Sequence, residues 1–172
     1  MRIQLLGSCL LAAAAIGLCG CPTRFSVSVA VRDKDLQDKS VEVHIVGVNE
    51  SENRQWSEYS MTKYWSPGDE LRAATVRNGY AKVMKFGQGL PTEQTLTTKD
   101  DIWPQKWENK RSSCLYVLAF LPGAFSDKPG DADARRRILP LDPKAWDFGR
   151  DKIQIELHAG GLTLLTPPKV KR

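Results

Sequence analysis

The chemistry that this sequence could perform rests first on its two histidines. His44 follows Glu42 by two residues, and His158 follows Glu156 in the same way. Residues two apart share one face of a strand, so two such strands side by side would gather two imidazoles and two carboxylates, a donor set that suits Zn²⁺. The alternative, which we favour, is that both faces are ordinary polar surface.

Motifs of catalysis are missing from the sequence. It contains no Gly-x-Ser-x-Gly elbow, no His-Glu-x-x-His pair, no phosphate-binding glycine loop and no Cys-x-x-Cys pair. We therefore expect a protein that is not an enzyme, with no catalytic residue, no metal site and no cofactor.

Cys21 has a more specific chemical context. Residues 1–20 combine a positive start at Arg2, an apolar stretch over 3–18 and small residues at the end, which is the layout of a secretory signal. Leu18-Cys19-Gly20-Cys21 resembles the bacterial lipobox. The resemblance implies that 1–20 is a lipoprotein signal peptide, and that the Cys21 thiol carries diacylglycerol. The freed amine usually takes a further acyl chain such as palmitate. The alternative is an uncleaved transmembrane helix, since the apolar run is about long enough to span a bilayer.

The compartment follows from the residues around this cleavage point. Pro22 stands where the best-known inner-membrane retention signal has Asp, so by analogy we expect the outer membrane, with the chain anchored by lipid and facing the periplasm. Loss of the leader removes only Arg2 from 25 basic residues, which leaves 24 against 20 acidic ones. This mild charge and the periplasmic address exclude nucleic acid as a partner. We expect Arg135-Arg136-Arg137 to form a solvated loop face and Cys114, the one unlipidated cysteine left, to be buried.

Period-two alternation predicts that strands dominate the rest of the chain. It is clearest over 25–31 and from 41 to near Asn49, with a short, mostly charged loop over 33–39 between them. Further strands are expected over 81–86, 94–98, 115–121, 138–141, 152–157 and 162–165, with a helical turn after Asp101 and a hairpin turn at His158-Ala159-Gly160-Gly161.

One helical insertion interrupts the strands. Asn49 can cap a helix over 49–65, with Glu52 in the reciprocal position, and Ser66-Pro67-Gly68-Asp69 ends it. Both faces of the 115–121 strand are apolar, so its second face needs a cover, and the aromatic 50–65 helix is the candidate. We predict a mainly β fold, an antiparallel β-sandwich with a helical insertion near 50–65, in one domain over 21–172 with a polar tail over 166–172.

This order of elements resembles the TssJ-type lipoproteins of bacterial type VI secretion systems. The likeness rests on the lipobox, the strand Ser40-Val41-Glu42-Val43-His44-Ile45-Val46, the aromatic insertion, the run Cys114-Leu115-Tyr116-Val117-Leu118-Ala119-Phe120 and the closing strand pair. It implies a transthyretin-like sandwich on the outer membrane that is not an enzyme and grips the periplasmic part of an inner-membrane partner. In that family the loop between the first two strands carries the contact. The corresponding residues here are Asp33, Lys34, Asp35, Leu36, Gln37, Asp38 and Lys39.

The tryptophans leave a second function open. The sequence holds five, and with the tyrosines they could form a stacking platform for glycan or a small solute. Exposed, coplanar tryptophans would favour this ligand-binding lipoprotein, whereas buried ones would favour the scaffold of a secretion-type envelope complex. We expect mainly core use, and hence the scaffold.

Overall fold

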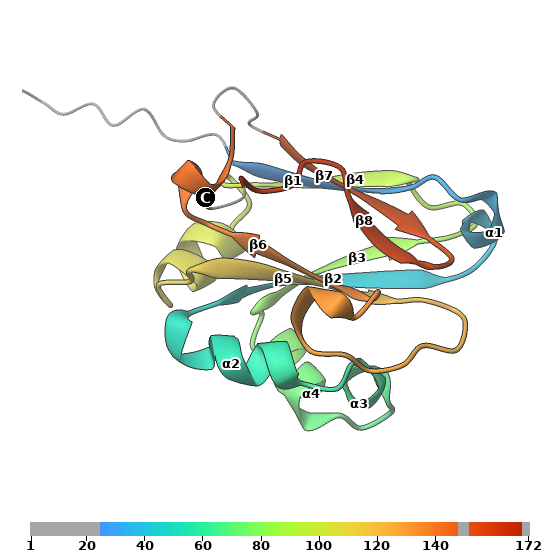
Figure 1. Ribbon diagram of the computed structural model, residues 1–172, viewed down its shortest axis with the longest axis horizontal. Coiled ribbons are helices and arrows are strands. Elements are labelled where there is room, and N and C mark those ends of the chain that lie inside the picture. The colour runs from blue at the N-terminus through green and yellow to red at the C-terminus, as the bar shows by residue number, and fades with distance from the viewer. Residues whose placement is uncertain (1–24, 148–151, 170–172) are drawn as a thin grey trace, which may run out of the picture.

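Two sheets and a group of helices form three layers (Figure 1). The computed structural model describes residues 25–147 and 152–169. In chain order the elements are β1 Ser26–Val31, α1 Lys34–Gln37, β2 Val41–Val48, α2 Glu50–Glu58, α3 Met61–Trp65, α4 Glu70–Arg77, β3 Ala81–Phe86, β4 Glu93–Thr97, η1 Trp103–Glu108, β5 Cys114–Phe120, η2 Gly130–Ala132, β6 Arg136–Pro140, η3 Pro143–Ala145, β7 Lys152–His158 and β8 Gly161–Leu164.

The upper sheet has the strand order β4-β1-β7-β8, and the middle sheet has the order β3-β2-β5-β6. Every pair is antiparallel except β1 and β7, which run parallel. Parallel neighbours need a long connection, and here the whole middle sheet separates β1 from β7 along the chain. The predicted mainly β sandwich with a helical insertion is confirmed, and this parallel pair is its one departure from antiparallel pairing among the described strands.

Side chains from both sheets fill the space between them. Alternate residues of β1, β2, β5 and β7 point inward, as period two requires, and are buried in one cluster. Gly47 of β2 faces the ring of Trp107 so closely that a Cβ there would lie 2.5 Å from the indole. This close approach explains why a glycine interrupts an otherwise β-branched strand.

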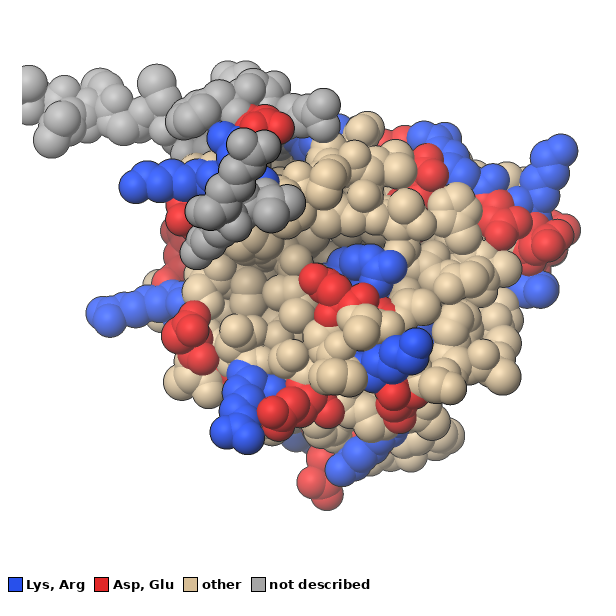
Figure 2. Space-filling view, in the orientation of Figure 1, with Lys and Arg blue, Asp and Glu red and all other residues tan. Residues whose placement is uncertain are grey.

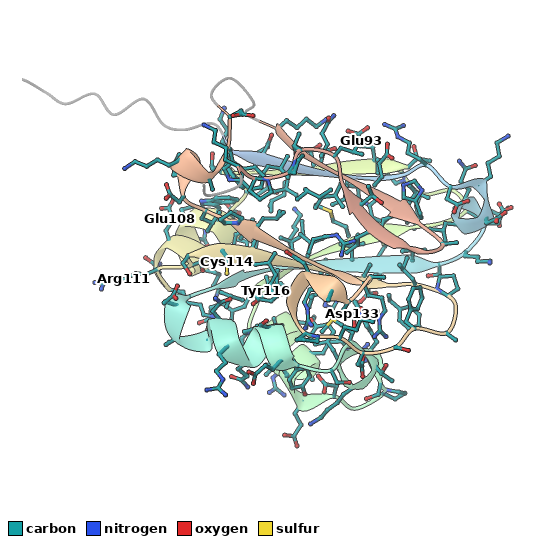
Figure 3. All side chains as sticks on the ribbon, viewed as in Figure 1. Glu93, Glu108, Arg111, Cys114, Tyr116 and Asp133 are labelled. Atoms are coloured by element: carbon teal, nitrogen blue, oxygen red, sulfur yellow. The ribbon has the colours of Figure 1, made fainter. Side chains whose placement is uncertain are left out.

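A second core lies between the middle sheet and the helices. It gathers Trp56, Tyr64 and Trp65 from α2 and α3 against Tyr116 and Leu118 of β5. Figure 3 shows Cys114 and Tyr116 on this side of β5, above α2. The prediction that the aromatic insertion covers the second face of this strand is confirmed, except that Phe120 at its end stays exposed.

The insertion is three helices, and the expected single helix over 49–65 is wrong. Asn49 and Glu52 form the predicted capping box at the start of α2. Ser60 then caps α3 by accepting a hydrogen bond from the Lys63 amide, which restarts the chain in a new direction. Beyond the turn at Gly68, which has φ of +81°, Asp69 caps α4 in the same manner. Each new cap competes with helix continuation, so the segment folds as short pieces.

The predicted strands all occur, with ends that shift by one or two residues. The helical turn after Asp101 is present as η1, with Pro104 near its start, where the missing amide costs nothing. The β7–β8 hairpin turns at Ala159-Gly160, as expected. The 33–39 segment, expected as a loop, contains the four-residue helix α1.

Residues at the carboxyl end continue to contact the fold. Thr166 is buried, and its hydroxyl accepts a hydrogen bond from the Gln154 amide at 2.9 Å. The Lys169 amide donates to the Ala145 carbonyl at 2.7 Å. Positions 170–172, the leader 1–20 and Cys21 lie outside the described residues. Within 25–147 and 152–169, no helix has the length and apolar character needed to cross a membrane.

Candidate functional site

The segment 33–39 forms one end of the sandwich, at the right of Figure 1. The Asp33 side chain holds this segment in place. One of its carboxylate oxygens accepts a hydrogen bond from the Asp35 amide at 3.0 Å, and the other accepts one from the Ala159 amide at 2.9 Å. These two backbone hydrogen bonds, the one from Ala159 first, hold the pKa of Asp33 below its ordinary value. Asp33 therefore caps α1 and also ties it to the β7–β8 turn.

The Leu36 side chain anchors the segment to the core between the sheets. This side chain is fully buried in the cluster between the sheets, so it is out of reach of a partner in this conformation. Burying a leucine contributes about 1.5–3 kcal/mol, which offsets the entropy of ordering a short charged helix. The remaining residues of the segment are exposed apart from half-buried Asp33, namely Lys34, Asp35, Gln37, Asp38 and Lys39.

Two further connections complete this end. In the β3–β4 connection, Gly87 has φ of +148°, and a Cβ there would meet the Lys39 carbonyl oxygen at 3.1 Å. Beyond it, Leu90 is one of the few large hydrophobic side chains exposed on the described part of the chain. The end surface therefore combines the α1 segment with the turns that follow β3 and β7.

Charges around this end are of both signs. Figure 2 shows basic and acidic side chains crowded together over α1. On the upper sheet, Glu93 (Figure 3) accepts from the Ser28 hydroxyl, from Lys152 at 2.9 Å and from Arg32 at 3.4 Å. The hydrogen bond from Ser28, followed by the bond and charge of Lys152, lowers the pKa of Glu93. Exposed ion pairs of this kind contribute little to stability, but they give the surface a fixed charge pattern.

The two histidines do not meet. His44 is in the middle sheet and His158 is in the upper sheet, so their Glu-x-His faces are never neighbours. No group of three or more His, Cys, Asp or Glu side chains in the described ranges is placed to hold a metal.

The prediction that His44 lies on polar surface is also wrong. The helical layer buries it, with Nδ1 2.7 Å from the Tyr64 hydroxyl and Nε2 2.7 Å from a Glu42 oxygen. Burial lowers the pKa of His44, against the opposing effect of Glu42. The imidazole is therefore a neutral bridge between β2 and α3.

The arginine run is the largest correction to the sequence analysis. Arg135 and Arg136 are buried, whereas a solvated loop face was expected. Arg135 binds Asp133 with two nitrogens at 2.9 and 3.0 Å and reaches Asp127 at 2.6 Å. Burial raises the pKa of Asp127, but hydrogen bonds from Ser60, Thr62 and Arg135 outweigh burial and hold it well below its ordinary value. The run is a structural clamp on the helical layer.

Arg136 donates only to backbone carbonyls. Its nitrogens reach Gly130, Trp56 and Tyr59 at 2.8, 3.0 and 2.9 Å, and also the Lys128 carbonyl. Two of these carbonyls belong to the end of α2, where helix carbonyls lack intrahelical partners. The sequence carries no local sign of this arrangement, because all four acceptors are backbone atoms and two of them, on Trp56 and Tyr59, lie 80 and 77 residues away.

All five tryptophans are buried. Trp56 and Trp65 belong to the helical core, and Trp103, Trp107 and Trp146 lie between the sheets. Trp103 and Trp107 pack edge to face, with an interplanar angle of 62°. The condition for a stacking platform, exposed and coplanar rings, is not met. Cys114 is buried as predicted, and burial raises the pKa of its thiol to about 11.

The features that went unpredicted include α4, the arginine clamp and the exposure of Phe120. The first had a signal, since Asp69 and Glu70 after Pro67-Gly68 are typical of a helix start. The other two depend on contacts between distant segments and have no local signature.

Comparison with known proteins gives a likeness of fold. No protein-family model matches the chain, and no curated protein matches its sequence. A chain of the solved structure "T6SS protein TssM C-terminal domain (869-1107) from EAEC" is similar with a TM-score of 0.53 at 15% identity, over 82% of this chain and 99% of that one.

Two other solved structures are more distant. The type VI secretion lipoprotein TssJ1 from Pseudomonas aeruginosa has a TM-score of 0.45 at 12% identity, over 87% of this chain and 99% of its own. Lip from Serratia marcescens, a membrane-bound component of the type VI secretion system, has a TM-score of 0.42 at 16% identity, over 86% of this chain and 98% of its own. The names of all three structures refer to the type VI secretion system. At 15% identity, the feature that this chain shares with the first structure is the fold.

Proposed function

We propose that this protein is a non-catalytic scaffold lipoprotein of a type VI secretion-like envelope complex. Acyl chains on Cys21 anchor it to the outer membrane on the periplasmic side. The exposed residues of 33–39 then dock the periplasmic domain of an inner-membrane partner.

The observation that carries this proposal is the direction of β1. Cys21 lies only four residues before Phe25, and β1 begins at Ser26. The strand runs six residues to Val31, about 20 Å, and the 33–39 segment follows directly. The amino end of β1, which follows Cys21 along the chain, and the 33–39 segment therefore lie at opposite ends of the sandwich. A module tethered at Cys21 would present α1 away from its membrane, toward a partner that reaches across the periplasm.

A scaffold of this kind must also stay bound to one membrane, and the acyl chains would provide that binding. Each buried methylene contributes about 0.8 kcal/mol, so one acyl chain binds reversibly and two or three hold stably. Confinement to a thin layer also raises the effective concentration of the module toward its partner. The similarity to type VI secretion structures supports this role at the level of fold.

The alternative, a lipoprotein that recognises glycan or a small solute through surface aromatics, has less support. It needs exposed tryptophan rings, and every tryptophan side chain of this chain is buried. The buried side chains of His44, Arg135 and Asp133 are bonded to neighbours that lock structural elements together. This use of its buried polar groups favours a scaffold.

Replacing Cys21 tests the anchor. In cells, Cys21→Ser should move the protein from the membrane fraction to a soluble or uncleaved form, because serine cannot form the thioether to lipid. Cys19→Ser and Cys114→Ser are matched controls that should stay in the outer-membrane band of a density gradient. Mass spectrometry of the wild-type protein should find the acyl chains on residue 21. A folded Cys21→Ser protein that has lost its leader and stays in the outer-membrane band would refute the anchor.

Photo-crosslinking tests the docking end. With p-benzoylphenylalanine in place of Asp38, ultraviolet light should link the full-length protein to the periplasmic domain of an inner-membrane protein. The matched control has the crosslinker at Lys99, which precedes η1 at the opposite end. Equal capture of that protein from both positions, or its capture from Lys99 alone, would refute docking through 33–39.

A further inference from the structure

The last residue of β5 is exposed although the six before it are buried. Phe120 lies on the face that α2 and α3 cover elsewhere, two positions beyond Leu118. Its side chain is 47% exposed, and its ring centre lies 5.5 Å from that of Trp65. A large aromatic side chain left open at the edge of a helix-covered sheet is typical of contact surfaces.

A groove of about 440 Å³ opens beside this ring. We call it the aromatic groove and define it by Thr62 and Trp65 of α3, Phe120 and Leu121 at the end of β5, and Phe125 and Arg135 beyond. The Arg135 guanidinium stacks over the Phe125 ring at 5.4 Å, while Asp127 and Asp133 already neutralise its charge. The walls are therefore mainly apolar, with little free charge on the Arg135 side.

Two polar groups at the Trp65 ring lack a usual partner. The indole N–H of Trp65 lacks an acceptor, and the guanidinium of Arg72 lacks a carboxylate among the described residues. The Trp65 side chain is 8% exposed, and its indole Nε1 makes no hydrogen bond to any described residue. An unpaired buried donor costs about 1–3 kcal/mol. Arg72 of α4 adjoins the groove without lining it: the guanidinium lies over the same ring at 5.7 Å and donates to the carbonyl of Ser66, a lining residue, at 3.3 Å. It forms no ion pair with a described carboxylate.

The aromatic groove belongs to the same end of the molecule as 33–39. Phe120 pairs across the middle sheet with Glu42, the second residue of β2. β2 begins at Val41, directly after that segment. One partner could therefore contact both surfaces.

We propose that the aromatic groove docks an extended segment of the partner protein that carries an apolar, preferably aromatic, side chain and a carboxylate one or two residues away. The apolar side chain would lie between Trp65 and Phe125 against Phe120. The carboxylate would bind Arg72 at the edge of the groove. This inference rests on the proposed function and adds the chemistry of the segment that the partner must supply.

The first experiment maps the contact in the full-length protein in cells. With p-benzoylphenylalanine in place of Phe120, the crosslinked peptide, identified by mass spectrometry, should come from the same protein that the Asp38 position captures. It should contain the apolar–acidic pair. The matched control is Val76, which is also exposed but lies on α4 outside the groove, and it should give no such product.

The second experiment tests the charge. Arg72→Gln should weaken binding of a synthetic peptide of the crosslinked segment about tenfold, which corresponds to about 1.4 kcal/mol. Arg77→Gln, on the exposed side of the same helix, should leave binding unchanged. Arg72→Glu should abolish the crosslink in cells, and Asp or Glu→Lys in the partner segment should restore it.

The outcomes separate this inference from the proposed function. Capture from Asp38 without capture from Phe120 would overturn the groove and leave the docking end standing. Capture from Phe120 alone would uphold the groove and overturn docking through 33–39, and capture from neither would overturn both. A Phe120 product that is a second copy of this chain or a glycan, or a crosslink that survives Arg72→Glu, would also overturn the groove.

Discussion

Replacing Arg136 with methionine should destabilise the fold more than any other single arginine change. The guanidinium donates four hydrogen bonds to carbonyls on α2 and on the loop before β6, and it is fully buried. Hydrogen bonds from a charged donor contribute about 1.5–3 kcal/mol each, and burying the charge costs several kcal/mol, so we expect a net loss of about 3–4 kcal/mol. In a chain of this size that lowers Tm by about 10 °C.

The measurement is urea unfolding followed by tryptophan fluorescence, since Trp56 lies at the site. Arg77→Met is the matched control, because Arg77 is exposed, and it should change stability by less than about 0.5 kcal/mol. Arg136→Lys should fall between the two, since an ammonium cannot reach carbonyls arranged around a planar fork. A loss below about 1 kcal/mol for Arg136→Met, or a lysine variant as stable as the native protein, would refute this reasoning.

Three further predictions concern other buried groups. His44 should make stability depend on pH: its folded pKa is below the ordinary 6.5, so the unfolded chain binds the proton first. The contribution of neutral His44 to the free energy of unfolding should be fully present above pH 6.5 and should fall at lower pH by at most about 1.4 kcal/mol per pH unit. In urea titrations at several pH values, His44→Gln should remove this dependence, whereas His158→Gln should keep it. Leu36→Ala should cost about 2–4 kcal/mol in the same assay and Leu90→Ala, exposed on the neighbouring turn, far less; equal losses would contradict the anchoring of α1. The Cys114 thiol, with its pKa raised to about 11, should not react with Ellman's reagent in the native protein at pH 8 and should react fully in urea; rapid native labelling would show that it is accessible.

The sequence by itself determined the strands and the sides of each strand. Alternation in β1 and the two-sided apolar run of β5 are local patterns, because side chains on a strand alternate every residue. The need for a cover over β5 followed from that run, and the aromatic residues near 50–65 supply it. The resemblance to TssJ-type lipoproteins came from the same order of elements.

Only the tertiary structure decided what the polar residues do. His44 and Arg136 have sequence neighbours typical of a surface, yet both are buried, because α2, α3 and the loop before β6 fold over them. Their partners lie 20 and 80 residues away, at Tyr64 and at the Trp56 carbonyl. A buried polar group depends on whichever distant atom satisfies it, and no local pattern records that atom. Phe120 was misjudged for the same reason, since its exposure depends on where the helical layer ends.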